Sequence, residues 1–204
     1  EKFIKDILYK KLNAKFIYVS QNFKFGKNRK GNVKTLKVYE KKFSYKTIVT
    51  FPYKESKKII SSSLIRKNIS MGKISVVTKL LGRPWSIIGK VIKGSKRGRT
   101  VGYPTCNILL ENYILPKLGV YAVLVKTKNF KKKGIANIGY RPTFNGKKLL
   151  LEVNIFGINL NLYNKIIEVS FLRFIRPEKK FNGVNQLKKQ IKKDINKVKK
   201  YVQR

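Results

Sequence analysis

The residues with the clearest chemical potential lie in one short segment, "GSKRGRTVGYPTCN", which spans residues 94–107. Glycines allow backbone N–H groups to approach a ligand closely, and basic side chains add positive charge. The combination suits a polyphosphate ligand, and the residues concerned are Gly94, Lys96, Gly98, Arg99 and Gly102. A basic surface hairpin followed by a turn is the alternative explanation of this composition.

Two oxygen-bearing side chains, Thr105 and Asn107, close the same segment. On an extended chain, residues two positions apart point to the same side, so the hydroxyl and the carboxamide oxygen would face one ligand together. Mg²⁺ takes hard oxygen ligands and leaves several positions to phosphate and water. The spacing therefore indicates a magnesium–nucleotide site.

The charge balance favours anionic partners in general. The chain has 49 Lys and Arg against 9 Asp and Glu, which gives a formal net charge of +40. Such a potential attracts any polyanion, including nucleic acids. The basic residues are spread along the whole chain among many Ile and Asn residues, as an AT-rich genome favours through its codons. We therefore expect nucleic acid to bind only by non-specific charge attraction.

Histidine and cysteine usage narrows the chemistry further. The chain has no histidine and one cysteine, Cys106. These counts exclude histidine metal sites, histidine general bases and an internal disulfide. No apolar run approaches the roughly 20 residues that span a bilayer, and the first residues read as an amphipathic helix rather than a signal peptide. We expect a cytoplasmic protein without a membrane partner.

The elements that must position these residues differ between the two halves of the chain. In residues 1–81 helical and strand patterns alternate, which is typical of an α/β layered domain. The three serines at 61–63 have the composition that caps a helix N-terminus. The expected order is a helix near 1–12, a strand at 15–20, a helical stretch at 33–43, a strand at 46–51 and a short helix after the serines.

From residue 82 onward short strands dominate, as in a small barrel or sandwich. A turn-forming sequence, Gly82-Arg83-Pro84, precedes them, so we place a domain boundary between residues 81 and 82. A final helix is expected over 184–202, because its apolar residues fall at spacings of three and four and would pack on the barrel. The expected strands are 85–94, 119–127, 132–140, 149–157 and 165–174.

Taken in order, the motifs of residues 82–204 resemble the riboflavin kinase family. The family's Gly-x-x-x-Gly-Arg and Gly-x-Pro-Thr-Ala-Asn elements fit residues 94–107. Further matches are "LGVYAV" at 118–123, "GIANIGYRPTF" at 134–144, "LEVNIF" at 151–156 and "FLRFIRPEKKF" at 171–181. The resemblance implies a six-stranded antiparallel β-barrel with a C-terminal helix. It also implies phosphoryl transfer from MgATP to the ribityl 5'-hydroxyl of riboflavin, giving FMN and ADP.

The resemblance assigns ligand roles residue by residue. ATP would contact Gly94, Lys96, Gly98, Arg99, Gly102 and Thr105, and Mg²⁺ would be held by Thr105 and Asn107. Cys106 replaces the family's usual alanine, and Asn154 stands where histidine is common. Neither departure removes a proposed ligand.

Glu152 would be the general base for the riboflavin hydroxyl. The other carboxylates of this half lie in a polar loop, in another strand, after a proline or on the final helix, and they are Glu111, Glu168, Glu178 and Asp194. Glu152 instead lies within an apolar strand, where a carboxylate needs a reason to be. The alternative is a solvent-facing Glu152 paired with one of the many lysines.

For the flavin, Arg176, Glu178 and Phe181 match the family's Arg-Pro-Glu-x-x-Phe region near the ring system. An aromatic residue in a connection between barrel and helix serves core packing equally well. Both explanations of Phe181 stay open from the sequence.

Residues 1–81 resemble the later part of an FMN adenylyltransferase (FAD synthetase) domain, which commonly precedes this kinase in bacteria. Residues 21–33 resemble its flavin-side segment, with Phe25 and Gly26. The motif at 60–66 resembles its ATP-phosphate segment, where Ser61, Ser62, Ser63 and Arg66 lie at a helix start. That domain's early His-x-Gly-His motif has no counterpart in a chain without histidine.

Together, the chain resembles the C-terminal portion of a bifunctional riboflavin kinase/FMN adenylyltransferase. The expected fold is an α/β remnant of a Rossmann-like nucleotidyltransferase domain, followed by a six-stranded antiparallel β-barrel with a C-terminal helix. The expected small-molecule partners are riboflavin and ATP with Mg²⁺, and FMN is the product. The alternative from another class is a basic β-barrel that binds nucleic acid, although the aromatic residues form no basic–aromatic stripe.

Overall fold

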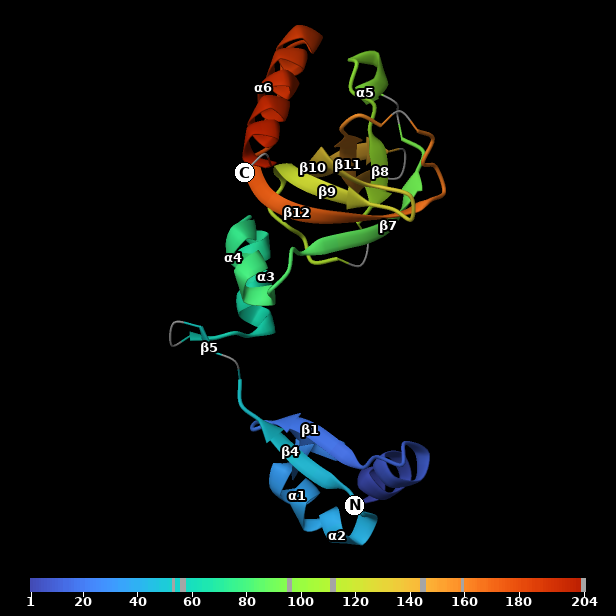
Figure 1. The fold of residues 1–204 in the computed structure, drawn as a ribbon, viewed down its shortest axis with the longest axis vertical. Coiled ribbons are helices and arrows are strands. Elements are labelled where there is room, and N and C mark those ends of the chain that lie inside the picture. The colour runs from blue at the N-terminus through green and yellow to red at the C-terminus, as the bar shows by residue number, and fades with distance from the viewer. Residues whose placement is uncertain are drawn as a thin grey trace. The chain divides into compact units, whose positions relative to one another are not determined.

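The computed structural model describes residues 1–52, 54–55, 58–94, 97–110, 113–143, 146–158 and 160–202. The chain divides into two compact units, Glu1–Ser61 and Ser62–Arg204 (Figure 1). The domain boundary predicted between residues 81 and 82 does not coincide with the division between these two compact units. That domain boundary stays a prediction.

The first unit is built on two parallel strands, β1 (Phe16–Ser20) and β4 (Lys46–Thr50). Parallel neighbours need a crossover connection, and helices α1 (Val33–Val38) and α2 (Glu40–Phe43) lie within it. Asn32 caps α1, because its side chain accepts a hydrogen bond from the Thr35 N–H at 3.1 Å. The parallel pair with its helical crossover confirms the expected α/β character of this part.

Shorter elements complete the first unit. Helix η1 (Ile4–Lys11) has a widened turn, in which the Leu12 N–H donates to the Ile7 carbonyl. The other short elements are β2 (Lys24–Phe25), η2 (Lys27–Arg29), β3 (Gly31–Asn32), β5 (Lys54–Glu55) and β6 (Lys58–Ile59). The core of the unit consists of Ile4, Val19, Leu36, Phe43 and Tyr45.

The second unit begins with two helices, α3 (Ser62–Ser70) and α4 (Ile74–Leu81). Helix α4 packs on strand β12 (Ile166–Arg176), and Ile74 belongs to the barrel's core. This packing explains why the helix pair belongs to the barrel's compact unit. Gly82 ends α4 in the left-handed region (φ +67°), which favours glycine.

Six strands then close into a barrel in which every neighbouring pair is antiparallel, in the order β10-β11-β8-β7-β12-β9. Besides β12, the strands are β7 (Ser86–Ile92), β8 (Cys106–Leu109), β9 (Gly119–Lys126), β10 (Lys131–Thr143) and β11 (Gly146–Ile155). The barrel implied by the family resemblance is therefore confirmed. Strand β8 was missing from the strands expected from the pattern, because it is only four residues long.

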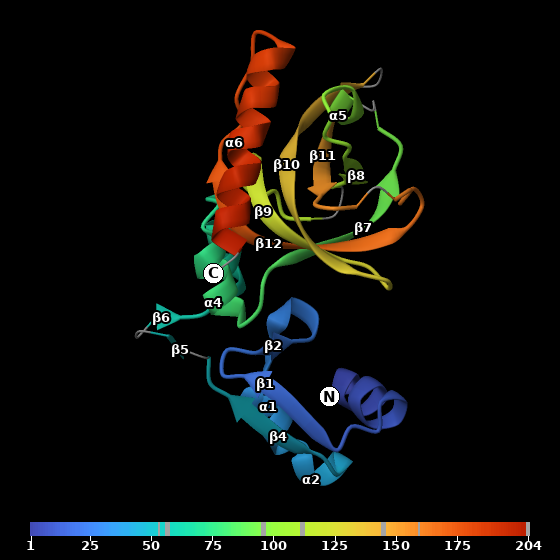
Figure 2. The same cartoon turned by 45° about the horizontal axis from the view of Figure 1, so that its top comes forward.

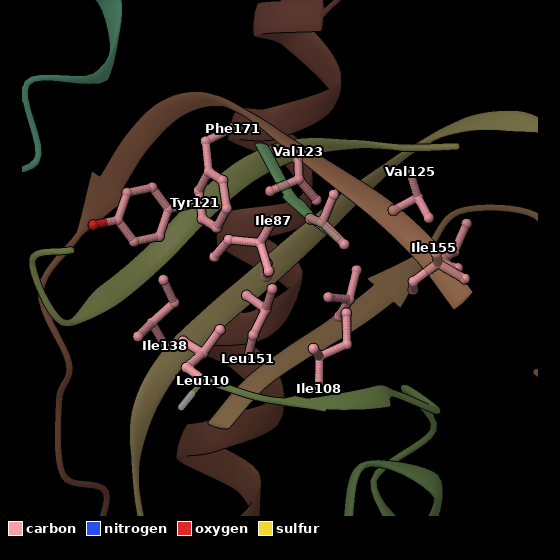
Figure 3. Packing of buried hydrophobic residues seen from close by; sticks show 14 of the residues in the cluster. Ile87, Ile108, Leu110, Tyr121, Val123, Val125, Ile138, Leu151, Ile155 and Phe171 are labelled. Carbon is pink, nitrogen blue, oxygen red and sulfur yellow. The ribbon is translucent and has the colours of Figure 1, made fainter. Parts of the chain in front are cut away.

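The barrel interior is filled by alternate residues of the strands (Figure 3). In one row Ile108, Leu151 and Ile138 lie opposite one another across β8, β11 and β10, and all are 1% exposed or less. The rings of Tyr121 and Phe171 meet edge to face at 5.1 Å. Because side chains alternate along a strand, the residues next to this row point to the outer face.

The long helix α6 (Val184–Val202) runs along the outside of the barrel beside β10 and β12 (Figure 2). Its Val198 is fully buried against Val120, Ala122 and Ile135. The predicted apolar face therefore packs on the barrel through its C-terminal half, whereas Val184 at the start is 57% exposed. Among the described residues, no helix combines the length and apolarity needed to cross a membrane.

Candidate active site

A cavity of about 450 Å³ lies between the outer face of the barrel and α6. Leu187 and Ile191 of α6 line one side of it, and the outer face of the sheet lines the other. The predicted site residues in its wall are Gly98, Thr105, Asn107, Glu152, Arg176, Glu178 and Phe181. The structure therefore gathers residues predicted for the nucleotide, the metal, catalysis and the flavin around one cavity.

Strand register places three polar residues in one row of the cavity wall. Glu152 of β11 lies opposite Asn107 of β8 on one side and Asn137 of β10 on the other. Directly opposite residues of antiparallel strands share a face of the sheet. The row lies on the outer face, so these side chains reach a ligand without entering the apolar interior.

Asn107 is 6% exposed, and its side chain makes no hydrogen bond within the described part of the chain. Its amide is not among the fully enclosed polar atoms without a partner, and Asn107 lines the first cavity, so a ligand there can contact it. A Cβ added at Gly94 would collide with the Asn107 amide, which explains the need for glycine there. The half-buried Thr105 hydroxyl lines the same cavity. These two side-chain oxygens fit a hard cation that phosphate and water also coordinate.

The Glu152 carboxylate forms a two-point ion pair with Arg141 of β10. The Arg141 Nε lies 3.2 Å from Oε1, and Nη2 lies 2.7 Å from Oε2. These hydrogen bonds raise the pKa of the Arg141 guanidinium. Glu152 thus faces the cavity and pairs with an arginine, rather than facing solvent with a lysine.

Arg141 received no role in the sequence analysis, although a signal was present. It is the only charged residue in the stretch "GIANIGYRPT" at 134–143, where every other residue is neutral. An isolated charge in a strand of a β-barrel indicates a partner on the same face.

The glycine-rich segment contains a short helical turn, α5 (Arg97–Thr100). The Tyr103 N–H closes this turn on the Gly98 carbonyl at 2.8 Å, and Gly102 follows with a φ of +86°, a conformation that favours glycine. Gly98 lies against the Thr105 side chain, where a Cβ would be 3.2 Å from the hydroxyl oxygen. The predicted ATP contact Lys96 lies outside the described residues.

Asn154 holds the end of this segment in place. Its Nδ2 donates to the Pro104 carbonyl at 2.7 Å, so β11 is tied to the residue before Thr105. From the sequence, Asn154 is recognised only as a departure from the family pattern. Its position two residues after Glu152 on the same strand was the signal that could have identified it.

A second cavity, of about 380 Å³, lies beside the first. Arg99, Cys106 and Tyr163 line it, and Thr105 lines both cavities. Burial raises the pKa of the Cys106 thiol. Thr105 therefore marks the place where a ligand in one cavity would meet a ligand in the other.

The three predicted flavin residues lie where β12 leads into α6. The Arg176 Nε is 2.8 Å from Oδ2 of Asp194, whose side chain is 1% exposed and also accepts from Gln190 at 2.8 Å. Arg176 thus fastens α6 to the barrel. Its guanidinium also lies over the Phe181 ring at 5.9 Å. Flavin contacts by Arg176, Glu178 and Phe181 stay a prediction.

The predicted adenylyltransferase residues are divided between the two units. Phe25 stacks on Phe23 in the first unit, with ring centroids 5.7 Å apart, and Gly26 follows with a φ of +77°. Ser61 is the last residue of that unit. Ser62 and Ser63 begin α3 of the second unit, and Arg66 is exposed on this helix. Their shared role at one phosphate site stays a prediction.

The fold and the cavity together define the class of protein. The outer face of the closed antiparallel barrel carries a carboxylate, a buried amide and a glycine-rich segment around one cavity. This is the arrangement of an enzyme that acts on small molecules. The family model described as riboflavin kinase matches residues 81–202. The chain belongs to the riboflavin kinase family. A second family model, described as FAD synthetase, matches residues 1–64.

Curated relatives extend this assignment. A protein of Buchnera aphidicola (subspecies Schizaphis graminum) is 50% identical over 98% of this chain and 66% of its own length. A Haemophilus influenzae protein is 40% identical over 95% of this chain and 63% of its own length. Both are named bifunctional riboflavin kinase/FMN adenylyltransferase, which confirms the predicted relationship. The chain thus spans slightly less than two thirds of these relatives.

A solved structure shares the fold over nearly the whole chain. It is titled as a macrolide-efflux protein from Streptococcus pneumoniae and is 36% identical, with a TM-score of 0.83. The match covers 97% of this chain and 64% of that one. Neither the family models nor these relatives favour the nucleic-acid-binding alternative.

Proposed function

We propose that this chain transfers the γ-phosphoryl group of MgATP to the ribityl 5'-hydroxyl of riboflavin, giving FMN and ADP. The observation that carries the proposal is the pairing of Glu152 with Asn107 across β8 and β11, on the wall of one cavity. Phosphoryl transfer depends mainly on positioning and on electrostatic stabilisation of the reactants. The pairing would place a general base beside a ligand for the nucleotide's metal and phosphates.

In this reaction the Glu152 carboxylate accepts the proton of the riboflavin hydroxyl. The hydroxyl oxygen forms a bond to the γ-phosphorus, the bond from that phosphorus to the β–γ bridging oxygen breaks, and ADP leaves. A positioned acid–base group of this kind typically contributes 10²–10⁴-fold to the rate, as an order of magnitude.

Thr105 and Asn107 are the residues that would hold Mg²⁺. The ion would supply charge neutralisation at the phosphates. Within the described residues no three His, Cys, Asp or Glu side chains gather into a metal-binding group. The two side-chain oxygens of Thr105 and Asn107 suit a cation that is coordinated mainly by phosphate and water.

The two cavities offer separate places for the two substrates. The first cavity suits the flavin, because Glu152 and the predicted flavin residues line it together with apolar side chains of α6. The second cavity suits the nucleotide, with Arg99 on its wall and Thr105 at the border. The glycine-rich segment contributes to both cavities, because Gly98 lines the first and Arg99 lines the second.

The test is the conversion of riboflavin by the purified chain. With MgATP, the chain should form FMN and ADP in equal amounts, measured by chromatography. Lumiflavin lacks the ribityl hydroxyl, so it should yield no ADP beyond a control without enzyme. Absence of FMN above that control, with a folded chain, would reject the proposal.

For residues 1–64 we propose a part in FMN adenylyl transfer. The match to the FAD synthetase family supports this role, as do the names of the relatives. Phe25 and Gly26 would face the flavin, and Ser61, Ser62, Ser63 and Arg66 would face ATP phosphates. The cytoplasmic location also stays a prediction.

A further inference from the structure

The Arg141 guanidinium lies between two carboxylates of the first cavity. It makes the two-point contact with Glu152, and its Nη1 is also 3.5 Å from Oε1 of Glu178. The Asn137 Nδ2 lies 3.4 Å from the same Glu178 oxygen. Arg141 therefore joins three parts of the fold: β10, β11 and the connection from β12 to α6.

The backbone makes room for this arrangement. Asn137, Gly139 and Arg141 lie on the same face of β10, because every second residue of a strand points to the same side. Asn137 is the residue opposite Glu152 on β11. Arg141 must therefore reach back along the strand, past Gly139, to meet the Glu152 carboxylate. A Cβ at Gly139 would collide with Oε1 of Glu178. The glycine thus leaves space for the carboxylate that closes the cluster.

A two-point contact does more than neutralise charge. Two parallel N–H···O bonds fix the plane of a carboxylate, whereas a single ammonium contact leaves the carboxylate free to rotate. Each carboxylate oxygen has about two acceptor positions, so Arg141 leaves others free for a substrate proton. The side chains of Arg141 and Glu152 are 35% and 25% exposed, and ion pairs that solvent reaches contribute little to stability.

We propose that Arg141 is a positioning residue for phosphoryl transfer, which orients the Glu152 carboxylate toward the substrate hydroxyl and holds Glu178 against the same face. The inference rests on the proposed function, in which Glu152 is the base. Arg141 lines the same cavity as Glu152, and its proposed role is to act on the substrates through Glu152.

The first test replaces Arg141 with glutamine. Misplacing a catalytic group by about 1 Å can cost on the order of 10²-fold, so kcat should fall by about that factor. The dissociation constants of riboflavin and MgATP should stay within about threefold of the parent, because the proposed role of Arg141 is to orient Glu152 rather than to bind a substrate. Arg83→Gln is the matched control, because Arg83 is exposed and lines neither cavity, and its side chain donates a hydrogen bond to the Pro84 carbonyl. It should keep the parental kcat.

A double-mutant cycle separates positioning from other roles. In the Glu152→Gln background, Arg141→Gln should lower the residual kcat by less than about threefold, because residues that act as a unit are strongly non-additive. A further loss of about 10²-fold in that background would overturn the inference, since Arg141 would then act independently of Glu152.

Arg141→Lys keeps the charge but not the two-point contact, and its kcat should lie between those of the parent and Arg141→Gln. This variant carries the test if Arg141→Gln does not fold by circular dichroism. A parental kcat in Arg141→Lys would overturn the inference. A parent chain that makes no FMN would instead refute the proposed function, so the two failures are distinguishable.

Discussion

Asn107 and Glu152 lie directly opposite each other in the β8–β11 pair, on the face of the barrel that lines the first cavity. One is a buried amide without a partner among the described residues, and the other is a carboxylate held by Arg141. A register slip of one residue would turn either side chain into the apolar interior. The antiparallel pairing therefore brings together the proposed base and the proposed metal ligand.

Glu152→Gln should leave riboflavin and MgATP binding intact, because the two side chains have nearly the same size. Loss of the base should lower kcat by about 10²–10⁴-fold, measured as FMN formed over time. Glu168→Gln on β12 is the matched control, because Glu168 does not line either cavity. A Glu152→Gln rate within about threefold of the parent would rule out Glu152 as the base.

Thr105→Val removes a hydroxyl with little change in volume. Since only the nucleotide's metal and phosphates need that oxygen, the dissociation constant of MgATP should rise more than that of riboflavin. Isothermal titration with each ligand checks the difference. An equal loss for both ligands would mean that the glycine-rich segment, rather than a metal contact, had been damaged.

Cys106 should be protected from alkylation by MgATP, because it lines the second cavity beside Arg99 and Thr105. It is the only cysteine of the chain, so mass spectrometry reports this site alone. Burial raises the pKa of the thiol, and only the thiolate reacts. Labelling without nucleotide should therefore be slow at neutral pH and accelerate as the pH rises. Labelling that saturating MgATP leaves unchanged would contradict the placement of the nucleotide.

The 204-residue chain should make FMN but no detectable FAD. Adenylyl transfer develops charge at the α-phosphate, and stabilising such charge is commonly the largest catalytic contribution. The chain has no histidine for the family's His-x-Gly-His motif, and it has at most the flavin-side segment, the serine segment and Arg66. Incubation with FMN, ATP and Mg²⁺ followed by chromatography checks this. Steady FAD formation above a control without enzyme would show that the remaining residues suffice.

The local features of this protein can be read from its sequence. Gly94, Gly98 and Gly102 mark the glycine-rich segment. Five of the six barrel strands were expected from the alternation of apolar residues and from the turns between them. The final helix was expected from its apolar spacing. Thr105, Asn107 and Glu152 were chosen by residue type and motif, and all three line one cavity. Such features are readable because they depend on neighbours within a few residues.

Which distant residues meet depends on the tertiary fold. Arg141 and Glu152 lie on different strands, and their ion pair depends on the β10–β11 register and on the open space at Gly139. Asp194 was expected merely on the final helix, yet it is buried against Arg176 at the end of β12. The four residues of β8 become a strand because β7 and β11 pair with them on both sides. These outcomes depend on barrel closure and non-local pairing, which no short stretch of sequence encodes alone.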